Sequence, residues 1–205
     1  MNTQRISINR LRGNSAIRDR GLSLTETLLV LGVIALVAVI AYNGYGTAVA
    51  SVKAGGDTQA VVLLAGNINR TFSTSPDYSG VTTPNLINAG LVPKTFKVRG
   101  TTNIIHSNGS DVIVGSAPAA NPIQYSIAYT NVPTDQCIEI AQSVSSAFQE
   151  VFISNSATAP TPSTLQTKPT TGVVKSITAP FFNTAAAIPL CAPGTAARHI
   201  IVYGS

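Results

Sequence analysis

The sequence predicts an α+β protein in which a long N-terminal helical spine packs on a mostly antiparallel β-sheet head. The first observation behind this is a continuous helical pattern over Leu22–Phe72, hydrophobic in its first half and amphipathic in its second. The second is the order of the segments after Phe72: a loop, several short apolar runs, another helix, a loop and further short runs. That order is typical of an antiparallel α+β domain.

The segment Leu22–Tyr42 is long enough to span a membrane. Its 21 residues give about 32 Å of helix, against a hydrocarbon core of ~30 Å. Five arginines and one aspartate place +4 of the net charge of +5 in residues 1–21. We therefore expect a single span with a cytoplasmic N-terminus. The remaining charge is balanced, so the pI of 9.5 does not indicate a nucleic-acid surface.

The second half of the spine, residues 44–72, has an apolar stripe at helical spacing. Its members are Val61, Leu64, Ala65, Ile68 and Phe72. Polar positions in the same stretch are Lys53, Asp57, Gln59, Asn67 and Arg70. Gly44 and Gly46 each cost a helix about 1 kcal/mol relative to alanine. Two interpretations of this pair are open. The glycines either ease a loss of helicity inside an assembled filament, or they only lower the helix propensity and have no role.

The rest of the chain, residues 73–205, is predicted to form the head. Turn residues break the helical pattern over Ser73–Gly80, and a short helical turn is expected between Pro84 and Pro93. A second helix is expected over Thr134–Phe148, with Thr134 or Asp135 as N-cap, and a surface loop over Ala157–Thr171. The predicted strands are Thr95–Arg99, Thr102–Ile105, Asp111–Val114, Ile123–Tyr129, Val173–Ile177 and His199–Tyr203.

Two cysteines, Cys137 and Cys191, lie far apart in the C-terminal half. Beyond a membrane anchor a disulfide between them is favoured, and neither has the CxxC neighbour typical of zinc or redox sites. His106 and His199 lack zinc-site spacing and are expected to be ordinary core or surface residues. With no P-loop, GxGxxG or GxSxG motif, we predict no enzyme activity, metal or cofactor.

The segment Arg18–Glu26 carries the functional signal. A basic leader ends in Gly21, and Glu26 then lies inside the apolar run, where a carboxylate costs roughly 2.5–3.5 kcal/mol unless it has a partner. This pattern resembles the processing site of type IV prepilins. The resemblance implies cleavage by a prepilin peptidase between Gly21 and Leu22 and methylation of the new Leu22 amine. Residues 1–21 would then be a removed leader, and residues 22–43 the membrane and assembly helix.

Glu26 is expected to pair with the Leu22 amine of a neighbouring subunit and so to set the register of a homopolymer. The resemblance also implies the inner-membrane assembly machinery as a partner, with no specific nucleic acid. The precursor would lie in the bacterial inner membrane and the product in an extracellular filament. The first residue Leu22, the leader of 21 residues and the late cysteine pair are similar to type IVb major pilins, which serve adhesion, aggregation or conjugative DNA transfer.

Alternatives remain open at this point. A minor pilin or a type II secretion pseudopilin would carry the same N-terminal signals. Ser23–Glu26 also matches a capping box, which would give Glu26 a purely local role. A secretory signal peptide cleaved after Ala48–Ala50 is a further interpretation, and it would place the mature N-terminus at Ser51.

Overall fold

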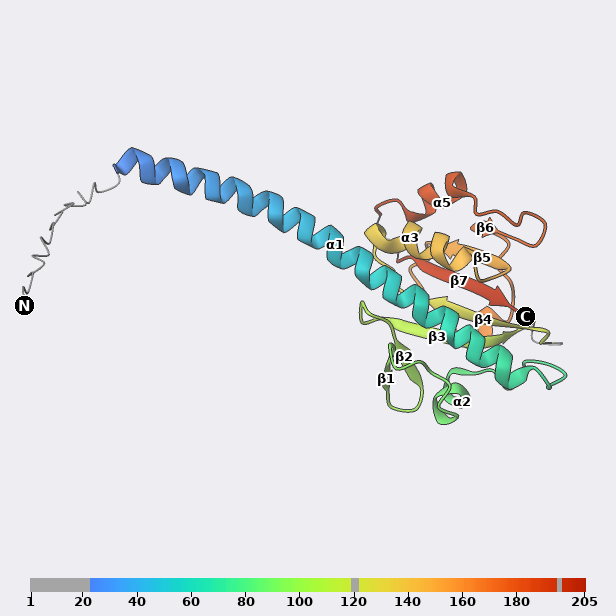
Figure 1. Ribbon diagram of the computed structural model, residues 1–205. Helices are drawn as coiled ribbons and strands as arrows, with labels where there is room; N and C mark the ends of the chain where they lie inside the picture. Colours follow the sequence, from blue (N-terminus) through green and yellow to red (C-terminus); the bar gives the residue numbers. More distant parts are fainter. Residues whose placement is uncertain (1–22, 119–121, 195–196) are drawn as a thin grey trace, which may run out of the picture. The chain divides into compact units, whose positions relative to one another are not determined.

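The computed structural model describes residues 23–118, 122–194 and 197–205 (Figure 1). The chain divides into two compact units, Met1–Asn43 and Gly44–Ser205, which are taken in turn. Helix α1, Leu24–Phe72, contributes residues to both units. Its C-terminal end coincides with the predicted end of the spine, whereas Leu22 lies outside the described residues.

In the first unit, the described chain from Leu24 onward is helix, and all its described side chains are exposed. The large apolar side chains from Leu24 to Tyr42 are between 46% (Val30) and 80% (Tyr42) exposed. Among the described residues, α1 is the one helix long and apolar enough to cross a membrane, with a window of mean hydropathy 2.5. A helix that is apolar all round needs lipid or other protein to cover it.

The second unit is built on a seven-stranded sheet of order β1-β2-β3-β4-β7-β5-β6, and every pairing recorded for it is antiparallel. The strands are β1 (Lys97–Arg99), β2 (Asn103–Ile105), β3 (Asp111–Ala117), β4 (Gln124–Tyr129), β5 (Glu150–Ser154), β6 (Val173–Lys175) and β7 (His199–Gly204). The predicted α+β class and antiparallel sheet are confirmed.

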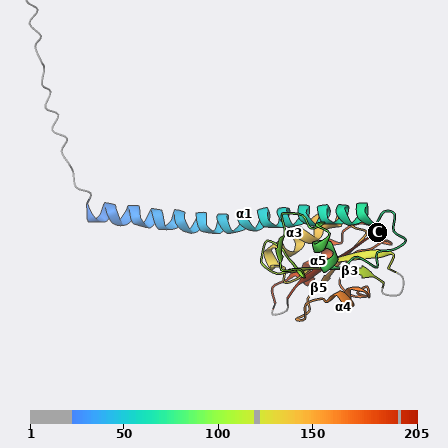
Figure 2. The same ribbon diagram turned by 90° about the horizontal axis from the view of Figure 1, so that it is seen from below.

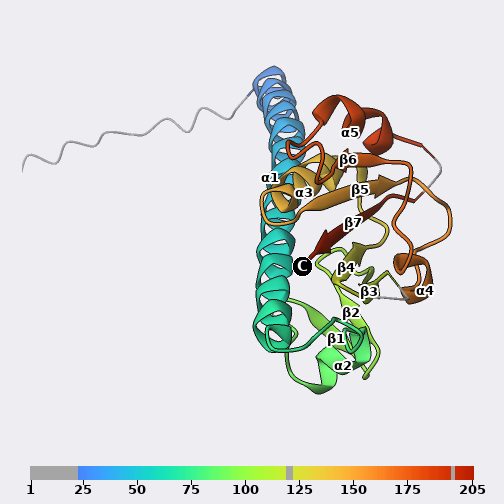
Figure 3. The ribbon, with the colours of Figure 1, turned by 90° about the vertical axis from the view of Figure 1, so that its right-hand side faces the viewer.

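The described residues of this unit form four further helices: α2 (Thr83–Asn88), α3 (Thr134–Ser145), α4 (Pro162–Leu165) and α5 (Thr184–Cys191). The part of α1 from Gly44 onward and α3 cover one face of the sheet, and α4 covers the opposite face (Figures 2 and 3). The larger core cluster contains Val61, Leu64 and Ile68 of the predicted apolar stripe. The smaller cluster, on the α4 face, centres on Leu165 and Tyr203.

Strand β4 explains the alternation seen in the sequence. Tyr125, Ile127 and Tyr129 lie in the larger cluster, whereas Ala128 lies in the smaller one. All six residues of β4 are buried, because the strand is central and covered on both faces. The predicted first residue, Ile123, lies outside the strand and is 56% exposed.

Several expectations about the head were wrong in detail. Neither Thr134 nor Asp135 is the N-cap of α3: the cap position is Pro133, without a side-chain hydrogen bond, and the helix ends at Ser145. Strand β5 and helix α5 were not anticipated. β5 begins with a charged residue, Glu150, shortly after α3 ends at Ser145, and α5 contains Pro189, so both lack the usual local signals.

The predicted surface loop over Ala157–Thr171 contains helix α4. A reciprocal pair of hydrogen bonds between Thr161 and Thr164 starts this helix, and its last residue, Leu165, is buried. The short helical turn expected between Pro84 and Pro93 is confirmed as α2.

Candidate functional site

The beginning of α1 is organised by Ser23. Its hydroxyl oxygen accepts a hydrogen bond from the backbone N–H of Glu26 at 3.3 Å. Its carbonyl oxygen accepts from the N–H groups of Glu26 and Thr27 at 2.9 and 3.1 Å. Ser23 thus makes the N-cap contact that its half of a capping box would make. Glu26 lies in the first turn, where a negative charge also interacts favourably with the helix dipole.

The Glu26 side chain is exposed, as are the other described side chains of this part of α1. Gly21 and Leu22, the predicted cleavage and methylation residues, lie outside the described residues. The proposed partner of Glu26 belongs to another subunit. The roles of these three residues therefore stay predictions.

Helix α1 continues through Gly44 and Gly46 without interruption. Apart from the neighbouring residues and backbone of α1 itself, a Cβ atom added at either glycine would meet no atom within 4 Å. The isolated subunit therefore keeps its helix here, and a change of helicity on assembly stays an open prediction.

Asp57 connects the second half of α1 to the sheet, although its charge suggested a solvent-facing position. Its side chain is buried, with 4% exposure. It accepts hydrogen bonds from the Ser107 N–H at 3.1 Å and the Ser107 hydroxyl at 2.7 Å. Its Oδ2 atom lies 3.5 Å from His106 Nδ1, and the Tyr129 hydroxyl donates to its carbonyl oxygen at 2.6 Å. A buried carboxylate with these partners fixes the helix against the turn between β2 and β3.

The two histidines are core residues, as expected. The Nε2 atom of His106 faces the Thr130 carbonyl oxygen at 3.0 Å, and its ring packs edge-on against Tyr129 at 5.5 Å. His199 accepts from the Asn131 N–H at 3.3 Å, and its Nε2 faces the Ser156 carbonyl oxygen at 3.1 Å. Burial lowers the pKa of His199, which favours the neutral imidazole.

Burial alone would raise the pKa of Asp57, but hydrogen bonds from His106 and Ser107, with the charge of His106, hold it below its ordinary 3.8. A carboxyl group whose pKa is lower in the folded state than in the unfolded state stabilises the fold at any pH above the unfolded-state pKa. This stabilisation is lost as the pH falls through the folded-state pKa. We expect Asp57→Asn to lower the free energy of unfolding by about 1–3 kcal/mol at neutral pH. The variant should also lose less stability than the wild type between about pH 4 and pH 2.

Urea unfolding of the full-length subunit in detergent, over a pH series, measures both effects. Glu139→Gln, at an exposed acid in the middle of α3, is the matched control: the amide oxygen can still accept from the Ser51 hydroxyl, so stability should be nearly unchanged. Equal pH profiles for the Asp57→Asn variant and the wild type would contradict the assigned role of this carboxylate.

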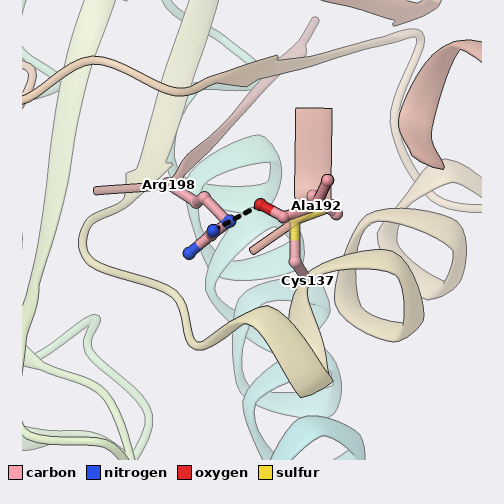
Figure 4. The surroundings of a disulfide bond; sticks show 4 residues. Cys137, Ala192 and Arg198 are labelled. Atoms are coloured by element: carbon pink, nitrogen blue, oxygen red, sulfur yellow. Dashed lines mark hydrogen bonds between the residues drawn. A yellow bond between two sulfur atoms is a disulfide. The ribbon is translucent and has the colours of Figure 1, made fainter. Parts of the chain in front are cut away.

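A disulfide joins Cys137 of α3 to Cys191, the last residue of α5, with the Cα atoms 5.7 Å apart. Both cysteines are buried, and the predicted pairing is confirmed. The bond encloses β5, α4, β6 and α5 in one covalent loop. Beside it, the Arg198 guanidinium donates to the Ala192 carbonyl oxygen and so links the end of α5 to the residue before β7 (Figure 4).

Sequence reasoning missed Asp57 and Arg198 as structural residues. A signal for Asp57 was present, since it lies four and seven residues before Val61 and Leu64 and therefore on the buried stripe. Arg198 had no such signal. Its partner, the carbonyl oxygen of Ala192, directly follows α5, and α5 was not anticipated.

The long apolar helix, the antiparallel sheet and the disulfide-bounded C-terminal region together define a type IV pilin. The chain belongs to the family described as PilS N terminal, whose sequence model matches residues 47–179. The resemblance to type IV pilins that the sequence indicated is thereby confirmed. The family and the fold are those of structural subunits.

Two relatives are each described as "Major structural subunit of bundle-forming pilus", one from Escherichia coli O127:H6 (strain E2348/69 / EPEC) and one from Escherichia coli O111:H-. Each is 26% identical over 123 residues, which is 60% of this chain. The match spans 64% of the length of either relative, slightly less than two thirds.

Two solved structures share the fold. One is TcpA, a type IV pilin from Vibrio cholerae El Tor biotype, with a TM-score of 0.55 and 20% identity over 75% of this chain and 99% of that one. The other is a type IVb pilin from Salmonella typhi, with a TM-score of 0.51 and 15% identity over 72% and 97% of the two chains.

Proposed function

We propose that this chain is the major structural subunit of a type IVb pilus, and that its function is to polymerise rather than to catalyse a reaction. The observation that carries the proposal is the apolar helix from Leu24 to Tyr42, whose described side chains are all exposed, on a chain whose head has its own closed core. The relatives described as major structural subunits of a pilus support the same interpretation.

The helix has two environments in this proposal. As a precursor the subunit lies in the inner membrane, where lipid covers the apolar side chains. In an extracellular filament water replaces the lipid, and a single exposed Leu or Ile left uncovered would cost about 1.5–3 kcal/mol. Twelve large apolar residues between Leu24 and Tyr42 are exposed, so packing against helices of other copies supplies most of the cohesion.

Glu26 sets the register of that packing. After cleavage by the prepilin peptidase, the Leu22 amine of one subunit meets the Glu26 carboxylate of the next. At ~4 Å and an effective dielectric constant of ~20, the pair gains about 4 kcal/mol before desolvation is subtracted. That is comparable to the burial of about one to three apolar side chains. The pair therefore contributes modestly to cohesion, but every other register leaves two buried charges unpaired.

The first test is the mature N-terminus. We expect mass spectrometry of sheared filaments to find a chain that begins at Leu22 with one added methyl group on its amine. Gly21→Ala should be processed, whereas Gly21→Val should accumulate as precursor, because the peptidase site requires a small residue there. A mature chain that begins at Ser51 would overturn the proposal in favour of a secreted protein.

The amount of subunit in the filament separates the major from the minor role. A major subunit accounts for nearly all the protein of sheared filaments, and its deletion removes them. If the chain is present only in trace amounts in filaments made of another subunit, it is a minor pilin.

A further inference from the structure

His106 lies buried in the turn between β2 and β3, and its neutral ring satisfies both of its nitrogen atoms. Nε2 faces the Thr130 carbonyl oxygen at 3.0 Å, and Nδ1 accepts the Asn108 backbone N–H at 3.3 Å. A carbonyl oxygen can only accept a hydrogen bond, and a backbone N–H can only donate one. The neutral ring therefore carries its proton on Nε2 and presents a lone pair at Nδ1.

A carboxylate competes with the Asn108 N–H for the same nitrogen atom. The Oδ2 atom of Asp57 in α1 lies 3.5 Å from His106 Nδ1, so an acceptor faces a lone pair. Uptake of a proton at Nδ1 reverses both contacts. The imidazolium can donate to Asp57 in a charge-assisted hydrogen bond, whereas the Asn108 N–H faces a hydrogen atom and loses its acceptor. His106 can bond to Asp57 or to Asn108, but not to both.

These two contacts connect the turn to different helices. Asp57 belongs to α1, and Ser107 in the turn donates two hydrogen bonds to its carboxylate. The Asn108 side chain donates to Oε1 of Gln136 in α3, one residue before the disulfide residue Cys137. The neutral ring therefore supports the link from the turn to α3, and the charged ring supports the link from the turn to α1.

Asp57 is the one charged group that faces the His106 ring within the described part of the chain. Tyr129 of β4 packs edge-on against the ring at 5.5 Å, but burial and the nearby Asp57 charge raise the pKa of Tyr129 well above its ordinary 10, so it stays neutral. Charged residues of the neighbouring segments form no ion pair or hydrogen bond with the ring in the described structure. They are Lys53, Lys97, Arg99, Asp111, Asp135, Glu139 and Arg198.

His199 of β7 shows the same bonding pattern without the carboxylate. Its Nδ1 accepts the Asn131 N–H at 3.3 Å, and its Nε2 faces the Ser156 carbonyl oxygen at 3.1 Å. Among the described residues it forms no ion pair, and burial lowers its pKa. The two buried rings thus differ in the presence of Asp57, which favours a proton on His106 alone.

We propose that His106 is a pH switch in which protonation at Nδ1 exchanges the hydrogen bond with Asn108 for one with Asp57. Histidine side chains take up a proton within roughly pH 5–8. At the upper end of this range the turn is tied to α3, and at the lower end it is held more tightly to α1 while the beginning of α3 becomes freer. The switch belongs to the folded head and does not depend on polymerisation.

The test follows the protonation of the ring nitrogen atoms by NMR. The full-length subunit in detergent, labelled isotopically, is titrated from about pH 8 to about pH 5. The chain has two histidines, and a His199→Gln variant assigns their signals. We expect both rings to carry a proton on Nε2 alone at the upper end. His106 should then gain a proton on Nδ1, the Asn108 amide signal should move with the same midpoint, and His199 should follow only at lower pH.

Two variants should move the titration of His106 in opposite directions. Asp57→Asn removes the charge that attracts the proton, so the ring should take it up at a pH lower by at least about one unit. Asn108→Ala keeps the backbone N–H but removes the bond to Gln136, so the neutral state is held less firmly and the ring should take up its proton at a higher pH. Asn88→Ala, at an exposed position of α2, is the matched control and should titrate like the wild type.

A His106 ring that carries a proton on Nδ1 at the upper end, or that stays neutral throughout, would overturn the switch. Equal titration of the wild type and Asp57→Asn, or a shift in the same direction in both variants, would also overturn it. The wild-type series and Asn108→Ala decide the question even where Asp57→Asn unfolds. Because all these measurements use the isolated subunit, a failure to form filaments would count against the proposed function alone.

Discussion

Replacement of Glu26 by leucine should abolish filament formation while leaving the subunit in the membrane. The variant removes a carboxylate from an apolar segment, so insertion becomes more favourable. Processing at Gly21 should largely persist, because the peptidase's main demand is the glycine. Sheared filament yield should fall at least tenfold relative to membrane-bound subunit, since the Leu22 amine of the neighbouring subunit loses its partner. Glu26→Gln should behave in the same way, because an amide cannot neutralise the amine.

Ser23→Ala is the matched control, because the structure gives Ser23 the capping role at the beginning of α1. Loss of this cap should cost about 1 kcal/mol and have a mild effect on filaments. If the two variants at Glu26 and Ser23 are equally mild, Glu26 acts only through the capping box. Normal filament yield from Glu26→Leu would end the proposal that this carboxylate sets the register.

A Cys137→Ala/Cys191→Ala double variant should lower the free energy of unfolding of the head by about 2–5 kcal/mol. The bond closes a loop with a sequence separation of 54, for which chain entropy alone predicts about 4 kcal/mol. The loop includes β5, which pairs with β7 next to the centre of the sheet. Urea unfolding of the full-length subunit in detergent measures the change, and piliation should fall because less folded subunit is available.

Gln142→Ala, at an exposed position of α3, is the control for substitution on that helix and should be nearly neutral. Reduction of the disulfide in the wild type should lower the free energy of unfolding as much as the double variant does. Because reduction keeps both sulfur atoms, agreement would show that the loss does not come from a cavity left by the substitutions. Equal unfolding midpoints for oxidised wild type and double variant would show that the fold does not depend on the disulfide.

The parts of the fold that depend on local pattern were predictable. Val61, Leu64 and Ile68 repeat with the helical period, so both the helix and its buried face could be inferred. The alternation of Tyr125, Ile127 and Tyr129 predicted a strand and placed these residues on one face. The disulfide was inferred from the setting of the two cysteines rather than from any local pattern.

The parts that depend on distant contacts were not predictable. Asp57 is stabilised by Ser107 and His106, some fifty residues away, and no single-sequence rule locates such partners. Glu150 can begin a buried strand because the ammonium group of Lys168, which follows α4 in the chain, pairs with its carboxylate.

The covalent loop between Cys137 and Cys191 also determines how the subunit responds to tension. A pulling force transmitted along the backbone passes from residue 137 to residue 191 through the sulfur atoms, so the enclosed segment cannot lengthen. At ~3.3–3.6 Å per residue, a segment of 54 residues would otherwise contribute about 180 Å of extension. A filament of such subunits would resist stretching, and the segment from β5 to α5 inside the loop would keep its shape under a force that strains the rest of the chain.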